Sequence, residues 1–86
     1  MEEIDNTVAD PWLRRRFAEN VRRVRKERNL TQEELSELCG YHRTYMSHVE
    51  RSVRTVSLDN LQRIAEALKT SPEVLLTEYV PESAPG

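Results

Sequence analysis

Residues 32–51 constrain the fold more than any other part of the sequence, because they carry the pattern of two short helices joined by a tight turn. Gly40 stands where the first helix has to end, and a left-handed backbone conformation at such a point favours glycine. Ser36, four residues earlier, is small enough to let a second helix cross close by. Apolar residues flank the turn at helical spacing and should face inward, namely Leu35, Cys39, Tyr41, Met46 and Val49.

The outward residues of the second helix distinguish between two interpretations of this pattern. An ordinary helical hairpin also needs apolar faces and a turn, so it remains an alternative. A helix-turn-helix, in contrast, places its second helix in a DNA major groove. The side chains that project from the first turn and a half of that helix all form hydrogen bonds: Arg43, Thr44, Tyr45 and Ser47, with His48 beside them. A merely solvated face would carry more Glu and Lys, so the composition favours the helix-turn-helix.

Length and composition exclude several other classes. The 86 residues fit one domain, which would bury only about 60–65% of its unfolded surface, so dimerisation would add stability. No stretch approaches the roughly 18 apolar residues of a membrane span. The amino end is acidic and lacks the features of a signal peptide, so we expect a cytoplasmic protein. The single cysteine, Cys39, excludes an internal disulfide and should be a small buried apolar residue.

The charge is strongly segregated although the net charge is only −2. Residues 11–28 carry eight Arg and Lys against two Glu, whereas residues 1–10 carry four acidic groups and no basic one. Residues 70–86 are also acidic. A cationic face on an anionic body suits a protein that meets phosphate on one side. For several of these arginines a solvated helix face is the alternative.

Periodicity predicts an all-α fold of five helices. The first helix, residues 11–28, should have Asp10 as its N-cap and Pro11 at its first position. Its buried stripe should consist of Leu13, Phe17, Val21 and Val24. Residues 1–10 are expected to form a flexible acidic arm, residues 11–77 the folded domain, and residues 78–86 a flexible tail.

The later helices carry recognisable start signals. Thr31 and Glu34 form a capping box for the second helix, which ends at Gly40. His42 is predicted to cap the third helix, residues 43–51. Ser57 should cap the fourth helix, and Ser71-Pro72 should start a short fifth one. The residues of the fourth helix at helical spacing are Leu58, Leu61, Ile64, Ala65 and Leu68.

Five short helices with a helix-turn-helix as the second and third resemble the phage repressor/Cro-type domains, also called the xenobiotic-response-element family. The resemblance covers about residues 17–76. Its motifs are LTQEEL (30–35), Gly40, SHVER (47–51) and SLDNLQRIAEAL (57–68). Within that family, residues 43–47 followed by Glu50-Arg51 look most similar to the controller proteins of restriction–modification systems.

The resemblance implies roles for individual residues. Gln32 should bond a phosphate, together with the free N–H groups at the start of its helix. Arg43 is the leading candidate for base readout, because its planar fork can pair with O6 and N7 of guanine. Thr44 is expected to touch a thymine methyl group or a phosphate. Tyr45 and Ser47 fit contacts to the DNA backbone or to base edges.

Other positions are structural or left open. Arg25 and Glu50 correspond to a partly buried ion pair that joins the first and third helices. Arg54 is expected to reach a phosphate or a base near the dyad, but Ser52 replaces a glycine common in this loop, which leaves that role open. For His48 an exposed spectator and a DNA contact are equally consistent with the sequence.

A single recognition helix reads only a few base pairs, so specific affinity requires a symmetric dimer on a palindromic operator, with half-sites about one helical turn apart. The expected two-fold patch consists of Val74, Leu75, Leu76 and Tyr79, with the intramolecular core as the alternative for at least one of them. We therefore expect a homodimeric, sequence-specific transcriptional regulator, which binds double-stranded DNA and controls a restriction–modification operon.

The sequence is also compatible with two other kinds of protein. An antitoxin or phage-type repressor would use the same chemistry on another operon. A protein-interaction module would bind a partner through the fifth helix and the acidic ends, with DNA contact only secondary. RNA polymerase is a further candidate partner of the regulator. An enzyme is not expected, since the two histidines lack metal-ligand spacing and no nucleophile–base arrangement is present. No metal or cofactor is expected either.

Overall fold

The computed structural model describes residues 8–81, and within this range the chain is all-α, as predicted. Its five helices are α1 (Trp12–Glu27), α2 (Gln32–Cys39), α3 (Arg43–Glu50), α4 (Leu58–Ala67) and α5 (Pro72–Leu76). The predicted arm and tail lie largely outside the described residues. No helix in the described range is long and apolar enough to cross a membrane.

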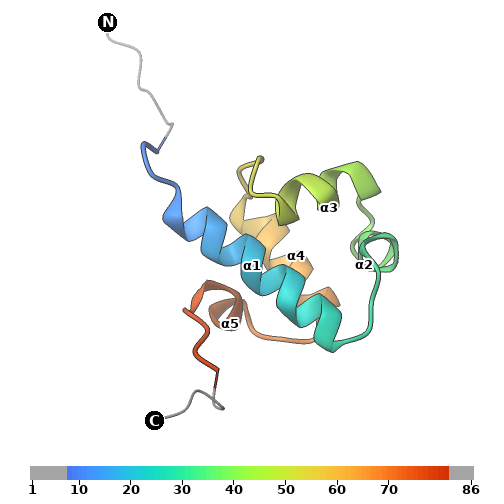
Figure 1. Cartoon of the computed structure of the whole chain (residues 1–86). Coiled ribbons are helices and arrows are strands. Elements are labelled where there is room, and N and C mark those ends of the chain that lie inside the picture. The colour runs from blue at the N-terminus through green and yellow to red at the C-terminus, as the bar shows by residue number, and fades with distance from the viewer. Residues whose placement is uncertain (1–7, 82–86) are drawn as a thin grey trace, which may run out of the picture.

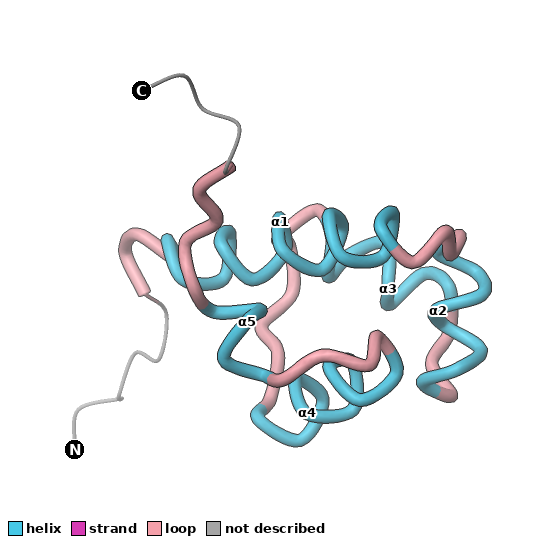
Figure 2. Tube along the Cα trace, turned by 90° about the horizontal axis from the view of Figure 1, so that it is seen from below, coloured by secondary structure: helices cyan, strands magenta, loops and turns pink. Residues whose placement is uncertain are grey.

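The helices surround one apolar core (Figure 1). α1 and α4 lie on opposite sides of it, with α5 between them at one end and α2 and α3 at the other (Figure 2). Every helix contributes to this core, whose members are Phe17, Val21, Val24, Leu35, Cys39, Met46, Val49, Ile64, Ala65, Leu68 and Leu75. The apolar faces expected for α2 and α3 are therefore confirmed.

Two residues of the predicted apolar stripes lie outside the core. Leu13 is 42% exposed and Leu58 is 80% exposed. Both stand in the first turn of their helices, Leu13 in α1 and Leu58 in α4, where the helix extends beyond the elements that cover its later turns. The prediction that Leu13 is buried was wrong, and Leu58, which stands at helical spacing with the buried residues of α4, also lies at the surface.

The turn between α2 and α3 has the predicted geometry. Gly40 adopts a left-handed conformation with φ of 76°, and the N–H of Tyr41 donates to the carbonyl of Ser36 at 2.9 Å. A Cβ atom on Gly40 would meet no atom within 4 Å, so the glycine is needed for its backbone conformation and not for space. Ser36 is buried, and its hydroxyl donates to the carbonyl of Gln32 at 2.7 Å.

Two of the predicted helix caps are present. The N–H of Glu34 donates to the Thr31 hydroxyl at 3.0 Å, and the N–H of Thr31 donates to the Glu34 carboxylate at 2.8 Å, which completes the capping box. The N–H of Asn60 donates to the Ser57 hydroxyl at 3.1 Å. Both caps satisfy backbone groups that the first turn of a helix leaves free.

The other cap predictions need correction. α1 begins at Trp12, so Pro11 occupies the N-cap position, and the Asp10 carboxylate accepts a hydrogen bond from Arg15 at 2.7 Å instead of capping the helix. His42 and Ser71 stand at the N-caps of α3 and α5, but neither side chain makes a capping hydrogen bond.

Arg22 of α1 and Arg28, which caps the end of α1, bind the carboxyl ends of two other helices. Arg22 donates to the carbonyl of Glu50, the last residue of α3, at 2.9 Å. Arg28 donates to the carbonyl of Leu68 after α4 at 3.0 Å. A guanidinium is favourable at such a position because helix carboxyl ends carry partial negative charge and unpaired carbonyls. Much of the positive charge of α1 therefore stabilises the fold.

Candidate nucleic-acid interface

The first turn of α3 presents Arg43 and Thr44 to solvent. Neither side chain forms a hydrogen bond to another described residue, so both can bind an external partner. Ser47 and His48, on the next turn, are half-buried. The opposite face of the helix places Met46 and Val49 in the core. α3 is thus fixed by its apolar side while its amino-terminal polar side chains stay accessible.

Tyr45 differs from its expected outward position. It is half-buried and packs against the core, with its ring edge-on to Tyr41 at a centroid distance of 5.0 Å. Its hydroxyl oxygen accepts a hydrogen bond from the Asn60 amide at 2.8 Å. The residue lies at the border between the exposed and buried faces of α3, and its long side chain reaches α4. Its contact with DNA remains a prediction.

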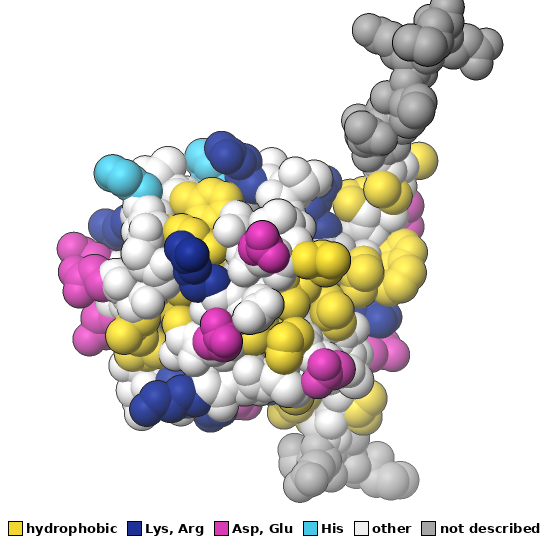
Figure 3. Space-filling view, turned by 180° about the vertical axis from the view of Figure 1, so that it is seen from behind, with side chains coloured by type: hydrophobic (Ala, Val, Ile, Leu, Met, Phe, Trp, Pro, Cys, Tyr) yellow, Lys and Arg dark blue, Asp and Glu magenta, His cyan; other side chains and the backbone are white. Residues whose placement is uncertain are grey.

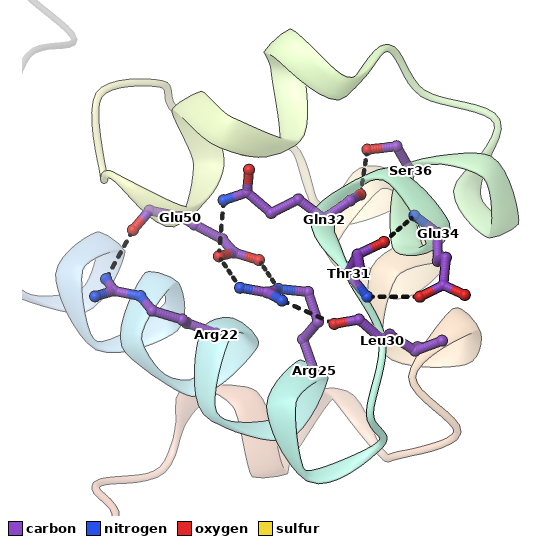
Figure 4. A network of polar contacts seen from close by, with 8 residues as sticks. All are labelled: Arg22, Arg25, Leu30, Thr31, Gln32, Glu34, Ser36 and Glu50. Carbon is purple, nitrogen blue, oxygen red and sulfur yellow. Dashed lines mark hydrogen bonds and ion pairs between the residues drawn. The ribbon is translucent and has the colours of Figure 1, made fainter.

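One ion pair joins α1 to α3 (Figure 4). Arg25 donates to Glu50 from Nε to Oε2 at 2.6 Å and from Nη2 to Oε1 at 3.0 Å. The Glu50 side chain is only 3% exposed and that of Arg25 only 11%. Arg25 also donates to the carbonyl of Leu30 at 2.8 Å. A buried carboxylate with such partners fixes the direction of α3 relative to α1.

Gln32 joins the same network, which sequence reasoning did not anticipate. Its Nε2 donates to Oε1 of Glu50 at 3.1 Å (Figure 4). A side-chain amide nitrogen carries two N–H groups, so one remains for a phosphate oxygen. Gln32 therefore connects the start of α2 to the end of α3, and its predicted phosphate contact stays a prediction.

The loop after α3 is closed by a left-handed residue. Ser52 has a φ of 62°, its N–H donates to the carbonyl of Val49 at 3.1 Å, and the N–H of Val53 donates to the carbonyl of His48 at 3.0 Å. Serine thus adopts the conformation for which glycine is favoured. Arg54 is exposed, and its guanidinium carbon lies 5.6 Å from the centroid of the Tyr45 ring.

Asn60 is the residue of this region that sequence reasoning missed. Its amide bonds to two tyrosines, since the Tyr41 hydroxyl donates to Oδ1 at 2.7 Å and Nδ2 donates to the Tyr45 hydroxyl at 2.8 Å. The only signal was indirect: two tyrosines four residues apart, one of them predicted to face inward, whose hydroxyls need partners.

The predicted two-fold patch on α5 needs correction at one position. Leu75 is fully buried in the core and is not available for another molecule. α5 is held against α1 because the Asn20 amide donates to the carbonyls of Leu75 and Thr77, both at 2.9 Å. Val74 and Tyr79 are exposed and Leu76 is half-buried. The guanidinium of Arg23 lies over the Tyr79 ring at 4.0 Å.

A larger apolar surface lies next to this patch. It is a groove of about 700 Å³ between the start of α1, the α3–α4 loop, α4 and α5. Trp12 is 53% exposed there, and Leu13 and Leu58 also line the groove, together with Leu61 and Leu76. Figure 3 shows hydrophobic side chains gathered beside the point where the described amino-terminal residues begin. This apolar groove contains both leucines that the core leaves out.

The buried thiol of Cys39 is expected to be unreactive at neutral pH. Burial raises the pKa of its thiol to about 11, an effect that the positive charge of Arg63 partly opposes. The thiol therefore stays protonated near neutral pH, and a protonated thiol is a poor nucleophile. Burial likewise raises the pKa of the Tyr41 hydroxyl. Among residues 8–81, no three His, Cys, Asp or Glu side chains are grouped as metal ligands.

These features define a DNA-binding helix-turn-helix domain, with α2 and α3 as the motif. The helix-turn-helix family matches residues 21–75, a range that runs from the middle of α1 to α5. The chain belongs to this family, whose members are DNA-binding transcription regulators. The predicted fold class and the predicted family resemblance are both confirmed.

Restriction–modification controllers are among the most similar proteins. Control protein C.SmaI of Serratia marcescens is 52% identical over 61 residues, which cover 71% of this chain and 73% of that protein. Control protein C.BamHI of Bacillus amyloliquefaciens is 45% identical over 65 residues, covering 74% and 80%. The restriction–modification controller C.Esp1396I, solved as a tetramer in complex with its natural 35 base-pair operator, has a TM-score of 0.72 at 29% identity, covering 77% and 87%.

Proposed function

We propose that this protein is the controller of a restriction–modification system. It binds a palindromic operator as a homodimer and regulates transcription of the restriction–modification genes and of its own gene. The observation that carries the proposal is the free polar surface of the first turn of α3, formed by Arg43 and Thr44, on a helix fixed by the Arg25–Glu50 ion pair. The similarity to control proteins supports the choice of operon.

We infer a task for each part of the motif. α3 enters the major groove with Arg43 foremost, where its guanidinium binds guanine through two hydrogen bonds. The start of α2 faces the phosphate backbone with Gln32 and its free N–H groups. Thr44 and Ser47 contact base edges or phosphates beside Arg43. Arg54 approaches the backbone from the loop, and His48 lines the side of α3.

A second copy of this chain is the occupant that we propose for the apolar groove. Trp12, Leu13 and Leu58 together expose an apolar surface that a monomer would leave in water. Leu76 of α5 lines the same groove, so the predicted patch is retained in part, with Val74 and Tyr79 at its edge. The assembly of C.Esp1396I on its operator as a tetramer supports self-association.

Arg43→Ala tests the reading of DNA sequence. The variant should lose its preference for the operator by about 1–3 kcal/mol and keep weak, salt-sensitive binding to any duplex. Lys26→Ala is the matched control, because it removes one exposed positive charge from α1 instead of α3. If the Arg43→Ala variant gives the same footprint on the operator as the wild type, the proposal that Arg43 reads the DNA sequence is wrong.

A contact with RNA polymerase is the second partner that we propose. α2 exposes Glu33 and Glu37 next to the motif, and an acidic helix surface suits a basic patch on another protein. Replacing both by Gln should lower transcription from the operator-bearing promoter while operator affinity is unchanged or increased. Equal transcription by the variant and the wild type would exclude this contact.

A further inference from the structure

Asn60 connects a helix outside the motif to the recognition helix. It lies on α4, and its side chain bonds Tyr41, in the turn before α3, and Tyr45, in the second half of the first turn of α3. The three groups form a continuous chain of two hydrogen bonds of 2.7 and 2.8 Å. The cap of α4 does not depend on this side chain, because the Ser57 hydroxyl binds the backbone N–H of Asn60.

The direction of the two bonds gives the tyrosines different properties. Tyr41 donates its only hydroxyl proton to Oδ1 of Asn60, so it has none to offer elsewhere. Tyr45 accepts from Nδ2 of Asn60, so its own proton is free to be donated to an external acceptor. The base-edge atoms O6 and N7 of guanine are acceptors of this kind.

The Tyr45 ring also contacts a positively charged side chain from the loop after α3. The guanidinium carbon of Arg54 lies 5.6 Å from the ring centroid, within the range of a cation–π contact. The Tyr45 ring also packs against the Tyr41 ring in a T-shaped arrangement, with a centroid distance of 5.0 Å. A movement of Tyr45 would therefore displace Arg54 as well, so the Asn60 amide influences two groups on the predicted DNA face.

We propose that Asn60 is a positioning residue for operator recognition. It holds the Tyr45 ring against Tyr41, leaves the Tyr45 hydroxyl as a donor toward DNA, and through the ring keeps Arg54 in place. Asn60 itself touches no DNA. The inference rests on the proposed function and extends it from the motif to α4.

Asn60→Asp separates this role from simple support of the fold. A carboxylate can accept from both tyrosines, so the bridge is kept while the Tyr45 proton is drawn inward. The probe is a duplex that the wild type enriches from a randomised DNA library, compared with a scrambled duplex of the same composition. The ratio of the two affinities should fall about tenfold, the effect of losing one hydrogen bond to a base edge, while the added negative charge weakens the binding of both duplexes equally.

Asn60→Ala removes both bonds and should lower the same ratio to a similar extent. Gln62→Ala, an exposed change on the same helix, should leave it unaltered. Tyr45→Phe should also lower the ratio, and adding Asn60→Ala to it should change the ratio less than twofold further, because both changes remove one interaction. Circular dichroism of each variant verifies the helix content.

The outcomes distinguish the two proposals. If the Asn60 variants lose affinity for both duplexes by the same factor, or combine additively with Tyr45→Phe, Asn60 only supports the fold and the inference fails. If the wild type itself does not discriminate any enriched duplex from its scrambled version, the proposed function fails and this inference fails with it.

Discussion

Arg25 of α1 binds Glu50 of α3 through two guanidinium nitrogens, and this pair joins helices whose residues stand 25 positions apart in the sequence. The glutamate is held a second time, because Arg22 donates to its backbone carbonyl at 2.9 Å. α3 is therefore fixed to α1 at its carboxyl end, while its amino-terminal turn stays free for DNA. The stability of the domain should depend strongly on this junction.

Glu50→Gln should lower the free energy of unfolding by about 3–5 kcal/mol, because it leaves the buried Arg25 charge without its partner. Chemical denaturation monitored by circular dichroism measures the loss. Glu27→Gln is the matched control, since it breaks the more exposed pair with Arg23 and should cost about 0–1 kcal/mol. If both variants lose a similar free energy of unfolding, the Arg25–Glu50 pair contributes no more to stability than an exposed ion pair.

Ser52→Gly should raise the free energy of unfolding by about 0.5–1 kcal/mol, because serine at a φ of 62° bears a conformational cost that glycine avoids. Gly40→Ala should lower it by about 1 kcal/mol for the converse reason, since no atom blocks the added Cβ. Thermal unfolding of both variants measures these opposite changes in stability. A Ser52→Gly variant that is less stable than the wild type would show that Ser52 is not strained by its backbone conformation.

The buried thiol of Cys39 should make stability fall at alkaline pH. Burial raises the pKa of Cys39 in the folded protein from 9.0 to about 11, so the folded state holds the proton more firmly than the unfolded chain. This contribution is fully present below about pH 9 and is lost as the pH rises through about 11. Between about pH 9 and pH 11 the free energy of unfolding should therefore fall more steeply with rising pH in the wild type than in the Cys39→Ala variant.

The same burial predicts slow alkylation of Cys39. Iodoacetamide at pH 8 should modify the native protein far more slowly than the protein in denaturant, where the thiol is exposed and has its ordinary pKa. Mass spectrometry of timed samples measures both rates. Equal rates would show that the side chain is accessible in solution.

Leu58→Glu should convert a dimer to a monomer without unfolding it, because the side chain is 80% exposed and lines the apolar groove proposed to hold a second copy. Sedimentation equilibrium measures the change. Leu38→Glu is the control, since Leu38 is 61% exposed on α2 and lies outside the groove. A monomeric wild type, or equal dissociation of both variants, would exclude the groove as the dimer interface.

Local sequence signals predicted the helices and the motif well. The Thr31–Glu34 capping box and Gly40 act within a few residues, so their structures follow from neighbours along the chain. Leu13 and Leu58 are exposed although they stand at helical spacing with buried residues, because such spacing defines a face but does not say how far other elements cover it. The burial of Leu75 was not predicted from the sequence, because a helix as short as α5 has too few residues for the apolar spacing to show which side is buried.

The sequence by itself determined five helices and the helix-turn-helix, because caps, turns and apolar periodicity depend on neighbours within about one or two turns. The residues that read DNA stay a prediction. Only the tertiary structure decided how the charge of α1 is used and how Tyr45 is held. Arg22, Arg25 and Arg28 bind groups 28, 25 and 40 residues away, and Asn60 reaches back 15 residues to Tyr45. Such partners meet only after the helices have packed, so no local pattern records them.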